Sequence, residues 1–214
     1  MKIFLFGGAE IGQVKQEVKM IGRIINNLAP RQVLHIPFAR IKASEKEWEG
    51  DWFSRYIHLA KGIEYLNAQQ SSDVSKAKSP LIFISGGGNN LQLIRKVKAD
   101  KKILKMIRGA SCIIGESAGA KILGKYFRSK GSDPASPMIA GLNIIKDTVI
   151  EPHYTERQRH KLLLEDMVET KTRYGIGIDA VTALELDTNK FPKNLKKIGV
   201  GAVDVKEMLT HDYA

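Results

Sequence analysis

Short apolar runs alternate with longer amphipathic segments along most of the chain. Runs such as KIFLF and LIFIS are apolar at every position, which is typical of strands buried on both faces. Between them, apolar side chains recur at the helical period, as in residues 14–28. We predict strands at residues 2–6, 32–38, 81–85, 111–115, 144–151, 175–179, 182–187 and 197–205, and helices at 14–28, 46–61, 90–108, 118–128 and 155–170. This order predicts an α/β fold of three layers, with a mostly parallel sheet between helices; residues 71–80 form a polar connection.

The composition fits a single soluble domain that spans residues 1–214. The chain is 43% hydrophobic and 27% charged, close to the averages for globular proteins. No apolar run approaches the roughly 20 residues of a membrane span, and the apolar run after Lys2 is too short for the core of a signal peptide. With Cys112 as its single cysteine, the chain is not a disulfide scaffold, and we expect a cytoplasmic protein without a membrane partner.

The net charge of +11 raises the question of a nucleic-acid partner. The lysines are dispersed, and the densest run, residues 96–108, interleaves them with aliphatic side chains. That pattern is typical of a helix with one packed and one solvated face, and it lacks aromatic side chains for base stacking. We therefore expect no nucleic-acid partner, while a homodimer is left open.

The most informative stretch is CIIGESAGA, residues 112–120. Its G-x-S-x-G motif, centred on Ser117, follows a predicted strand and precedes a predicted helix. A sharp strand-to-helix turn there holds the serine oxygen above the sheet, which is the geometry of a nucleophile elbow. We therefore predict that Ser117 is a catalytic nucleophile.

Two glycine runs follow predicted strands. The run in Ser85-Gly86-Gly87-Gly88-Asn89 is separated from the elbow by one helix, so a right-handed crossover sets the two loops side by side. Backbone N–H groups of this run and of Ala118 are then candidates for an oxyanion hole. The run at residues 7–12 is a poor dinucleotide fingerprint because Ala9 replaces the middle glycine, and neither run is a P-loop. We expect no cofactor.

A serine nucleophile needs a general base, which His153 supplies best among the five histidines. It lies at the end of a predicted strand just before a helix, whereas His35 and His58 sit inside predicted elements. A metal site at His153 and His160 lacks a third ligand, so we expect no metal. The apparent pKa of the base should be roughly 6–7, raised by a neighbouring carboxylate. Asp133 and Asp179 are both candidates for that carboxylate.

Taken together, these segments resemble the peptidase E and cyanophycinase family of serine peptidases, whose fold is similar to the class I glutamine amidotransferase domain. The resemblance rests on SGGGN (85–89), GESAGA (115–120), EPHY (151–154), TERQRHKLL (155–163) and GIGID…TAL (175–184). It implies that Ser117 is the nucleophile, that His153 is the base, and that N–H groups near Gly88 and Ala118 form the oxyanion hole.

The resemblance also bears on the triad acid. Peptidase E-like members carry an Asp in a D-x-P-like loop after the serine, which Asp133-Pro134 matches one residue out of step. Cyanophycinase-like members carry a Glu directly after the GID sequence, where this chain has Ala180. We therefore favour Asp133 over Asp179.

The function implied is a serine exopeptidase that hydrolyses dipeptides or short peptides, with an acidic N-terminal residue as in aspartyl dipeptidases. Arg157 is the nearer match to the arginine that holds the acidic residue in peptidase E-like relatives, and Glu116 replaces an aromatic residue there. We assign Arg157, Glu116 and Asn89 to substrate binding. The alternatives are an α/β-hydrolase-type esterase and a non-catalytic binding protein of the same fold. A glutamine amidotransferase would need cysteine at position 117.

Overall fold

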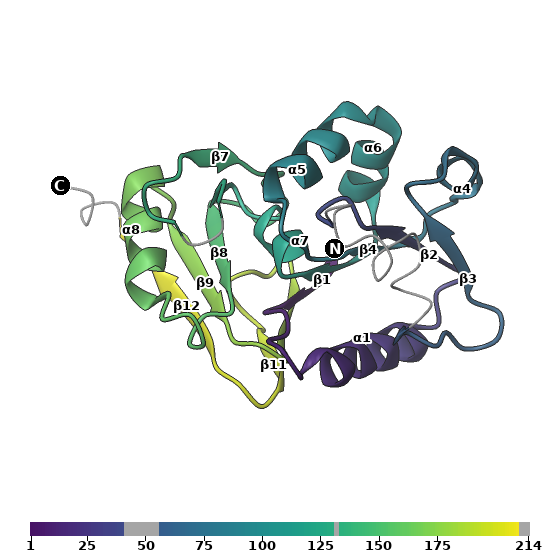
Figure 1. Cartoon of the computed structure of the whole chain (residues 1–214), viewed down its shortest axis with the longest axis horizontal. Coiled ribbons are helices and arrows are strands. Elements are labelled where there is room, and N and C mark those ends of the chain that lie inside the picture. Colours follow the sequence, from purple (N-terminus) through teal and green to yellow (C-terminus); the bar gives the residue numbers. More distant parts are fainter. Residues whose placement is uncertain (41–55, 131–132, 210–214) are drawn as a thin grey trace.

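The computed structural model describes residues 1–40, 56–130 and 133–209 (Figure 1). Twelve strands within these ranges form two sheets of seven and five strands, which lie next to each other and carry helices. The predicted α/β class and its covered sheet are confirmed. The expected helix at 46–61 falls mostly on residues outside the described part of the chain.

The seven-stranded sheet has the order β11-β10-β1-β5-β4-β2-β3. The five strands from β1 to β3 in this order run parallel, and β10 and β11 are added antiparallel at one edge. The bounds are β1 Lys2–Phe6, β2 Gln32–Ile36, β3 Glu64–Asn67, β4 Leu81–Ile84, β5 Cys112–Glu116, β10 Thr182–Asp187 and β11 Lys196–Gly199. Because the central strands are parallel, the loops after β1, β4 and β5 open at the same edge of the sheet.

Side chains of the central strands point alternately into two apolar cores. On β1, Ile3 and Leu5 face the helices α5 (Asn90–Ala99) and α6 (Lys101–Gly109), whereas Phe4 and Phe6 face α1 (Val14–Leu28). Figure 1 shows α1 on one side of the sheet and α5 and α6 on the other. Strands that are apolar at every position are therefore the consequence of helices on both faces.

The five-stranded sheet has the order β12-β9-β8-β6-β7. Its bounds are β6 Tyr126–Arg128, β7 Met138–Ala140, β8 Thr148–Pro152, β9 Tyr174–Ile178 and β12 Val203–Glu207. The helix α8 (His160–Thr170) packs on it through Leu163 and Met167, next to the buried ring of Tyr154. The single strand expected at 197–205 is instead two strands, β11 and β12, that belong to different sheets.

Three helices differ from their predicted limits. The helix expected at 90–108 is broken at Asp100, whose carboxylate caps α6 by accepting the N–H groups of Lys102 and Ile103. The helix after the elbow, α7 (Ala118–Lys121), stops after four residues and leads into β6. The connection at 71–80 contains the short helix α4 (Ser71–Lys76), and α8 begins at His160 rather than near residue 155.

Candidate active site

Ser117 lies directly after β5, in a backbone conformation that few residues with a side chain adopt. Its φ is 50° and its ψ is −108°. The Ser117 N–H donates to the carbonyl of Phe6 at 3.0 Å, which fixes the turn against the end of β1. A strained serine between a buried strand and a helix is the geometry expected for the predicted nucleophile elbow.

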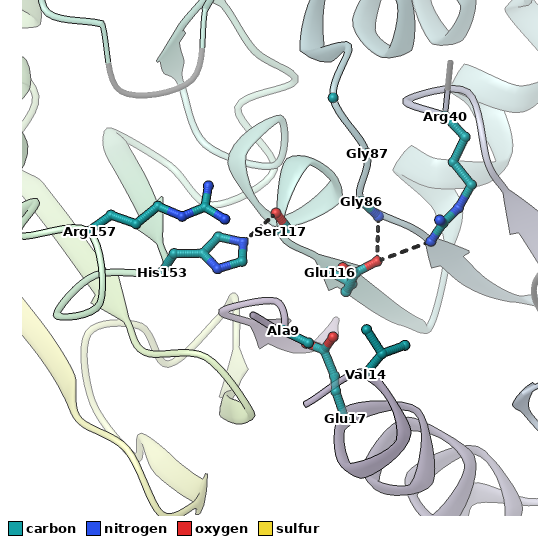
Figure 2. A pocket seen from close by; sticks show the side chains of 11 residues that line it. Ala9, Val14, Glu17, Arg40, Gly86, Gly87, Glu116, Ser117, His153 and Arg157 are labelled. Carbon is teal, nitrogen blue, oxygen red and sulfur yellow. Dashed lines mark hydrogen bonds and ion pairs between the residues drawn. The ribbon is translucent and has the colours of Figure 1, made fainter. Parts of the chain in front are cut away.

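The imidazole of His153 faces Ser117 across the gap between the two sheets. The distance from Ser117 Oγ to His153 Nε2 is 3.2 Å, and only 5% of His153 is exposed (Figure 2). His153 follows β8 with a φ of 51°, and its N–H donates to the Gly7 carbonyl at 2.9 Å. A Cβ on Gly8, whose φ is +90°, would lie 2.5 Å from His153 Nε2, so the turn after β1 leaves room for the imidazole only because residue 8 is glycine.

Among the residues that the structure describes, Glu10 places its carboxylate against the imidazole. Its Oε1 lies 2.8 Å from His153 Nδ1 and accepts from Arg157 Nε at 2.9 Å. Nδ1 is buried, and the Glu10 oxygen lies close to it without the alignment of a hydrogen bond. Glu10, not Asp133, therefore stands where a triad acid would act.

The two predicted acids lie elsewhere. Asp133 is exposed in the loop between β6 and β7, where its carboxylate accepts the N–H of Ala135 at 2.9 Å and closes its own turn. Asp179 is buried and accepts the N–H groups of Thr155 and Ala202, at 2.9 and 2.7 Å. Asp133 thus stabilises a surface turn, whereas Asp179 stabilises the loop that follows His153 through its bond to Thr155.

The sequence pattern does not point to Glu10, because a glycine run such as residues 7–12 indicates a nucleotide-binding loop rather than a catalytic acid. A usable signal was present in the order of the strands. Residues 7–12 follow the first strand, and the carboxyl ends of parallel strands meet at one edge of a sheet. Since β1 pairs in parallel with β5, an acidic side chain soon after β1 falls beside the nucleophile.

Burial dominates the protonation of the base. It lowers the pKa of His153 to about 4, and the positive charges of Arg157 and Arg159 act in the same direction, against the opposing charge of Glu10. The carboxylate thus raises the pKa as expected, but burial outweighs it and the pKa falls below the expected 6–7. Burial would raise the pKa of Glu10, but Arg157 and His153 outweigh it and lower that pKa. At neutral pH the site thus holds a neutral imidazole beside an ionised carboxylate.

The glycine loop after β4 packs directly on the elbow. A Cβ on Gly86 would lie 2.8 Å from the Ser117 Cβ, so the backbone approaches the nucleophile closely. The Gly86 N–H donates to Glu116 Oε2 at 2.5 Å and is therefore already used. Gly88 is exposed in the same loop, and Ala118 is the first residue of α7, a position whose N–H has no acceptor within its helix.

A pocket of about 310 Å³ opens at the nucleophile (Figure 2). It brings together Ser117, His153 and two predicted substrate-binding residues, Glu116 and Arg157. Its remaining lining comes from Ala9, Val14, Glu17, Arg40 and the three glycines 86–88. Asn89 is not part of the lining, because its side chain caps α5 by accepting the N–H of Gln92 at 2.9 Å.

A buried ionic cluster lies behind the base. Glu151, two residues before His153, accepts from Lys121 Nζ at 2.6 Å and from Arg159 Nη1 at 3.0 Å. Arg159 Nη1 also donates to the Pro152 carbonyl at 2.8 Å. Because Lys121 lies on α7, the cluster ties the strand that carries the base to the helix that follows the nucleophile.

Other candidate ligands stay apart. Within residues 1–40, 56–130 and 133–209, no three His, Cys, Asp or Glu side chains gather in a metal-binding arrangement.

In the same ranges no helix has the length and apolar character that crossing a bilayer requires. His35 is a core residue, stacked on Phe83 and bonded to Tyr65 and Ser85. Burial raises the pKa of Cys112 to about 11, so this thiol is not activated.

A serine on a strained elbow, within reach of a neutral and buried imidazole, defines a serine hydrolase. Residues 3–193 match the Peptidase family S51. The chain therefore belongs to peptidase family S51, a family of serine peptidases, as the resemblance predicted.

Individual relatives agree with this family. A cyanophycinase from Nostoc sp. is 27% identical over 92% of this chain and 76% of its own length. A cyanophycinase from Geminocystis herdmanii is 31% identical over 60% of this chain and 49% of its own length. A solved structure from Listeria monocytogenes EGD-e, assigned as a peptidase E protein, is similar in fold, with a TM-score of 0.57, 20% identity and coverage of 94% of this chain and 98% of that one.

Proposed function

We propose that the protein is a serine exopeptidase that hydrolyses dipeptides or very short peptides, with Ser117 as nucleophile, His153 as base and Glu10 as the carboxylate that supports the base. The observation that carries the proposal is the 3.2 Å approach of Ser117 Oγ to His153 Nε2 at the mouth of a small pocket. Its volume of about 310 Å³ is at the lower end of ligand pockets, which suits a dipeptide better than a folded chain.

The chemistry follows from the two facing atoms. His153 Nε2 takes the proton from Ser117 as Oγ attacks the carbonyl carbon of the peptide bond. Backbone N–H groups of Ala118 and of the glycine loop near Gly88 stabilise the oxygen that becomes negative. Nε2 then gives the proton to the departing amine, and an acyl-enzyme on Ser117 remains. Water hydrolyses the acyl-enzyme with His153 again acting as base.

Glu10 offsets the positive charge that His153 acquires in each transition state. Its ionised state at neutral pH supports that role, and so does its 2.8 Å approach to Nδ1. Arg157 holds Glu10 in place through Nε, and its Nη groups bond to none of the other residues that the structure describes, so they are available to a ligand. The acid is thus supplied by the turn after β1 rather than by Asp133.

Arg157 lies on the same side of Ser117 as His153 (Figure 2). Because the base protonates the departing amine, the leaving half of a substrate extends toward this side. The C-terminal carboxylate of a dipeptide belongs to that half, and a guanidinium suits a carboxylate. We therefore assign Arg157 to the peptide's carboxyl terminus. An acidic side chain on the N-terminal residue would instead face Glu116, so we propose neutral N-terminal residues.

The test combines labelling with a substrate panel. A fluorophosphonate should add one label, mapped to Ser117, and the panel should contain Ala-Leu, Leu-Leu, Asp-Leu and cyanophycin. We expect hydrolysis of the neutral dipeptides, with kcat reduced roughly 10³-fold or more in Ser117→Ala. Labelling at another serine would refute the nucleophile. If the protein is labelled at Ser117 but cleaves cyanophycin and none of the dipeptides, the proposed dipeptidase is wrong and the activity is that of a cyanophycinase.

Failure to label at all would favour the non-catalytic binding protein. The α/β-hydrolase esterase is not supported, because the chain matches family S51 over most of its length.

A further inference from the structure

Two buried carboxylates and one guanidinium line the pocket together with the nucleophile. Glu116 precedes the nucleophile, Glu17 comes from the first turn of α1, and Arg40 follows β2. Only 2% of Glu17 and 8% of Glu116 are exposed. In Figure 2, Glu116 lies on the side of Ser117 opposite His153 and Arg157, and Glu17 lies below them in the view. The catalytic steps described above make no use of Glu17.

The two carboxylates are not equivalent. Glu116 Oε2 accepts the Gly86 N–H at 2.5 Å and lies 3.9 Å from Arg40 Nη2. This oxygen therefore already has partners, and it helps to hold the glycine loop. Glu17 Oε1 is buried and, among the residues that the structure describes, has no hydrogen-bond partner. Leaving such an oxygen buried without a partner is costly, and native structures retain one only for a reason.

The charges of these three side chains suit a cationic ligand. With both carboxylates ionised, Glu17, Glu116 and Arg40 carry a net charge of −1. Burial and the neighbouring charge of Glu116 raise the pKa of Glu17 well above its usual value, and burial also raises the pKa of Glu116. Burial and the mutual repulsion of the two carboxylates therefore favour protonation of one of them. A cation entering beside Glu17 would replace that proton, balance the charge and satisfy Oε1.

The position of these carboxylates relative to the base indicates which part of a substrate reaches them. The leaving amine lies toward His153, so the acyl half extends from Ser117 toward Glu116 and Glu17. We propose that Glu17 is a specificity-determining residue that binds a cationic nitrogen on the acyl half of the substrate, which in a dipeptide is the α-ammonium group. This inference rests on the proposed exopeptidase, and it explains how such an enzyme would select a free N-terminus.

The first experiment compares Ala-Leu with lactoyl-leucine, in which a hydroxyl replaces the ammonium group. For the wild type we expect kcat/KM to favour Ala-Leu roughly 100-fold, because the analogue leaves the carboxylate unpaired. In Glu17→Gln that preference should fall below about tenfold, mainly through KM for Ala-Leu. Glu165→Gln, on the exposed face of α8, is the matched control and should keep the wild-type preference. An unchanged preference in Glu17→Gln, or none in the wild type, overturns the proposal.

N-acetyl-Lys-Leu and N-acetyl-Ala-Leu distinguish two sources of the cation. If the α-ammonium group is bound, both blocked peptides are poor substrates. If a basic side chain is bound instead, the lysine peptide is preferred and loses its advantage in Glu17→Gln. Both outcomes support a cation at Glu17, and they assign it to different atoms of the substrate.

A binding measurement separates this inference from the proposed function. L-Alaninamide is titrated into Ser117→Ala at pH 7 in two buffers of different ionisation enthalpy. We expect binding with release of a fraction of a proton, because the cation displaces the proton held by the carboxylates. The double variant Ser117→Ala/Glu17→Gln should bind at least about tenfold more weakly and without this release. Failure of Ser117→Ala to bind alaninamide would overturn the α-ammonium site, whether or not the wild type cleaves peptides.

Discussion

Replacing Glu10 with glutamine tests the assignment of the acid most directly. Glu10→Gln keeps the shape of the side chain and an oxygen that can face His153 Nδ1, but it removes the negative charge. The charge matters because His153 becomes an imidazolium in both transition states. The variant should therefore lower kcat while leaving the position of the imidazole largely intact.

The structure sets the size of the effect. The Glu10 side chain is 34% exposed, so an effective dielectric constant of about 40–80 is appropriate for its contact with His153. Over the 2.8 Å between the two atoms, this corresponds to about 1.5–3 kcal/mol, or a loss of roughly 10- to 150-fold in kcat. This is less than the about 10⁴-fold lost with a buried triad aspartate.

The assay is the dipeptide hydrolysis described above, with two readouts added. Asp133→Asn is the matched control, because Asp133 is exposed and contacts its own turn; we expect its kcat to stay within about twofold of wild type. NMR titration of His153 provides the second readout. Because Glu10 stabilises the imidazolium, its loss should lower the His153 pKa further below about 4.

Two results would contradict this reasoning. If Asp133→Asn lost more activity than Glu10→Gln, the acid would come from the β6–β7 loop after a rearrangement. If Glu10→Gln kept full kcat and an unchanged His153 pKa, the carboxylate would be a bystander held by Arg157.

Three further predictions concern the base and its surroundings. Because the pKa of His153 is about 4, the imidazole stays neutral above that pH, and kcat/KM should be flat from about pH 5.5 to 8. The value should fall only as the pH drops toward 4, with circular dichroism to confirm that the fold persists. A midpoint near pH 6.5 in the profile would contradict this prediction. Gly8→Ala should lower kcat/KM about 100-fold or more, because the added methyl group would press on the imidazole. The control is Gly62→Ala, at a similar φ of +93° in open space, which should lower stability alone. Equal losses of activity in the two variants would refute the clash. Glu151→Gln should lower the free energy of unfolding by about 3–5 kcal/mol in urea titrations, because it leaves two buried cations with less counter-charge. A change below about 0.5 kcal/mol would show that the cluster does not stabilise the fold.

The amino-acid sequence by itself determined the local parts of this site. Continuous apolar strands require cover on both faces, so KIFLF and LIFIS specified a helix-covered sheet before any pairing was known. The elbow at Ser117 is likewise contained in one strand, one turn and one helix. The strand end that carries His153 was found in the same way, because a strand followed by a turn is a local feature.

Tertiary structure decided which loops meet. Glu10 reaches His153 because β1 pairs with β5 on one side while the loop after β8 packs on the turn at Gly7 and Gly8. Those contacts join residues more than a hundred positions apart, and no spacing in the sequence encodes them. Asp133, in its D-P dipeptide, is a residue type that can serve as a triad acid, but its carboxylate accepts the N–H of Ala135 within its own turn.

The second sheet and the buried charge of Glu17 were hidden for the same reason. On an amphipathic helix such as α1, a glutamate in the first turn is ordinarily solvated, and only the approach of the glycine loop and Arg40 encloses it. Strand pairing across the chain likewise divides residues 196–207 between two sheets. Periodicity fixes which face of an element is apolar, whereas long-range packing fixes what that face and its ends will meet.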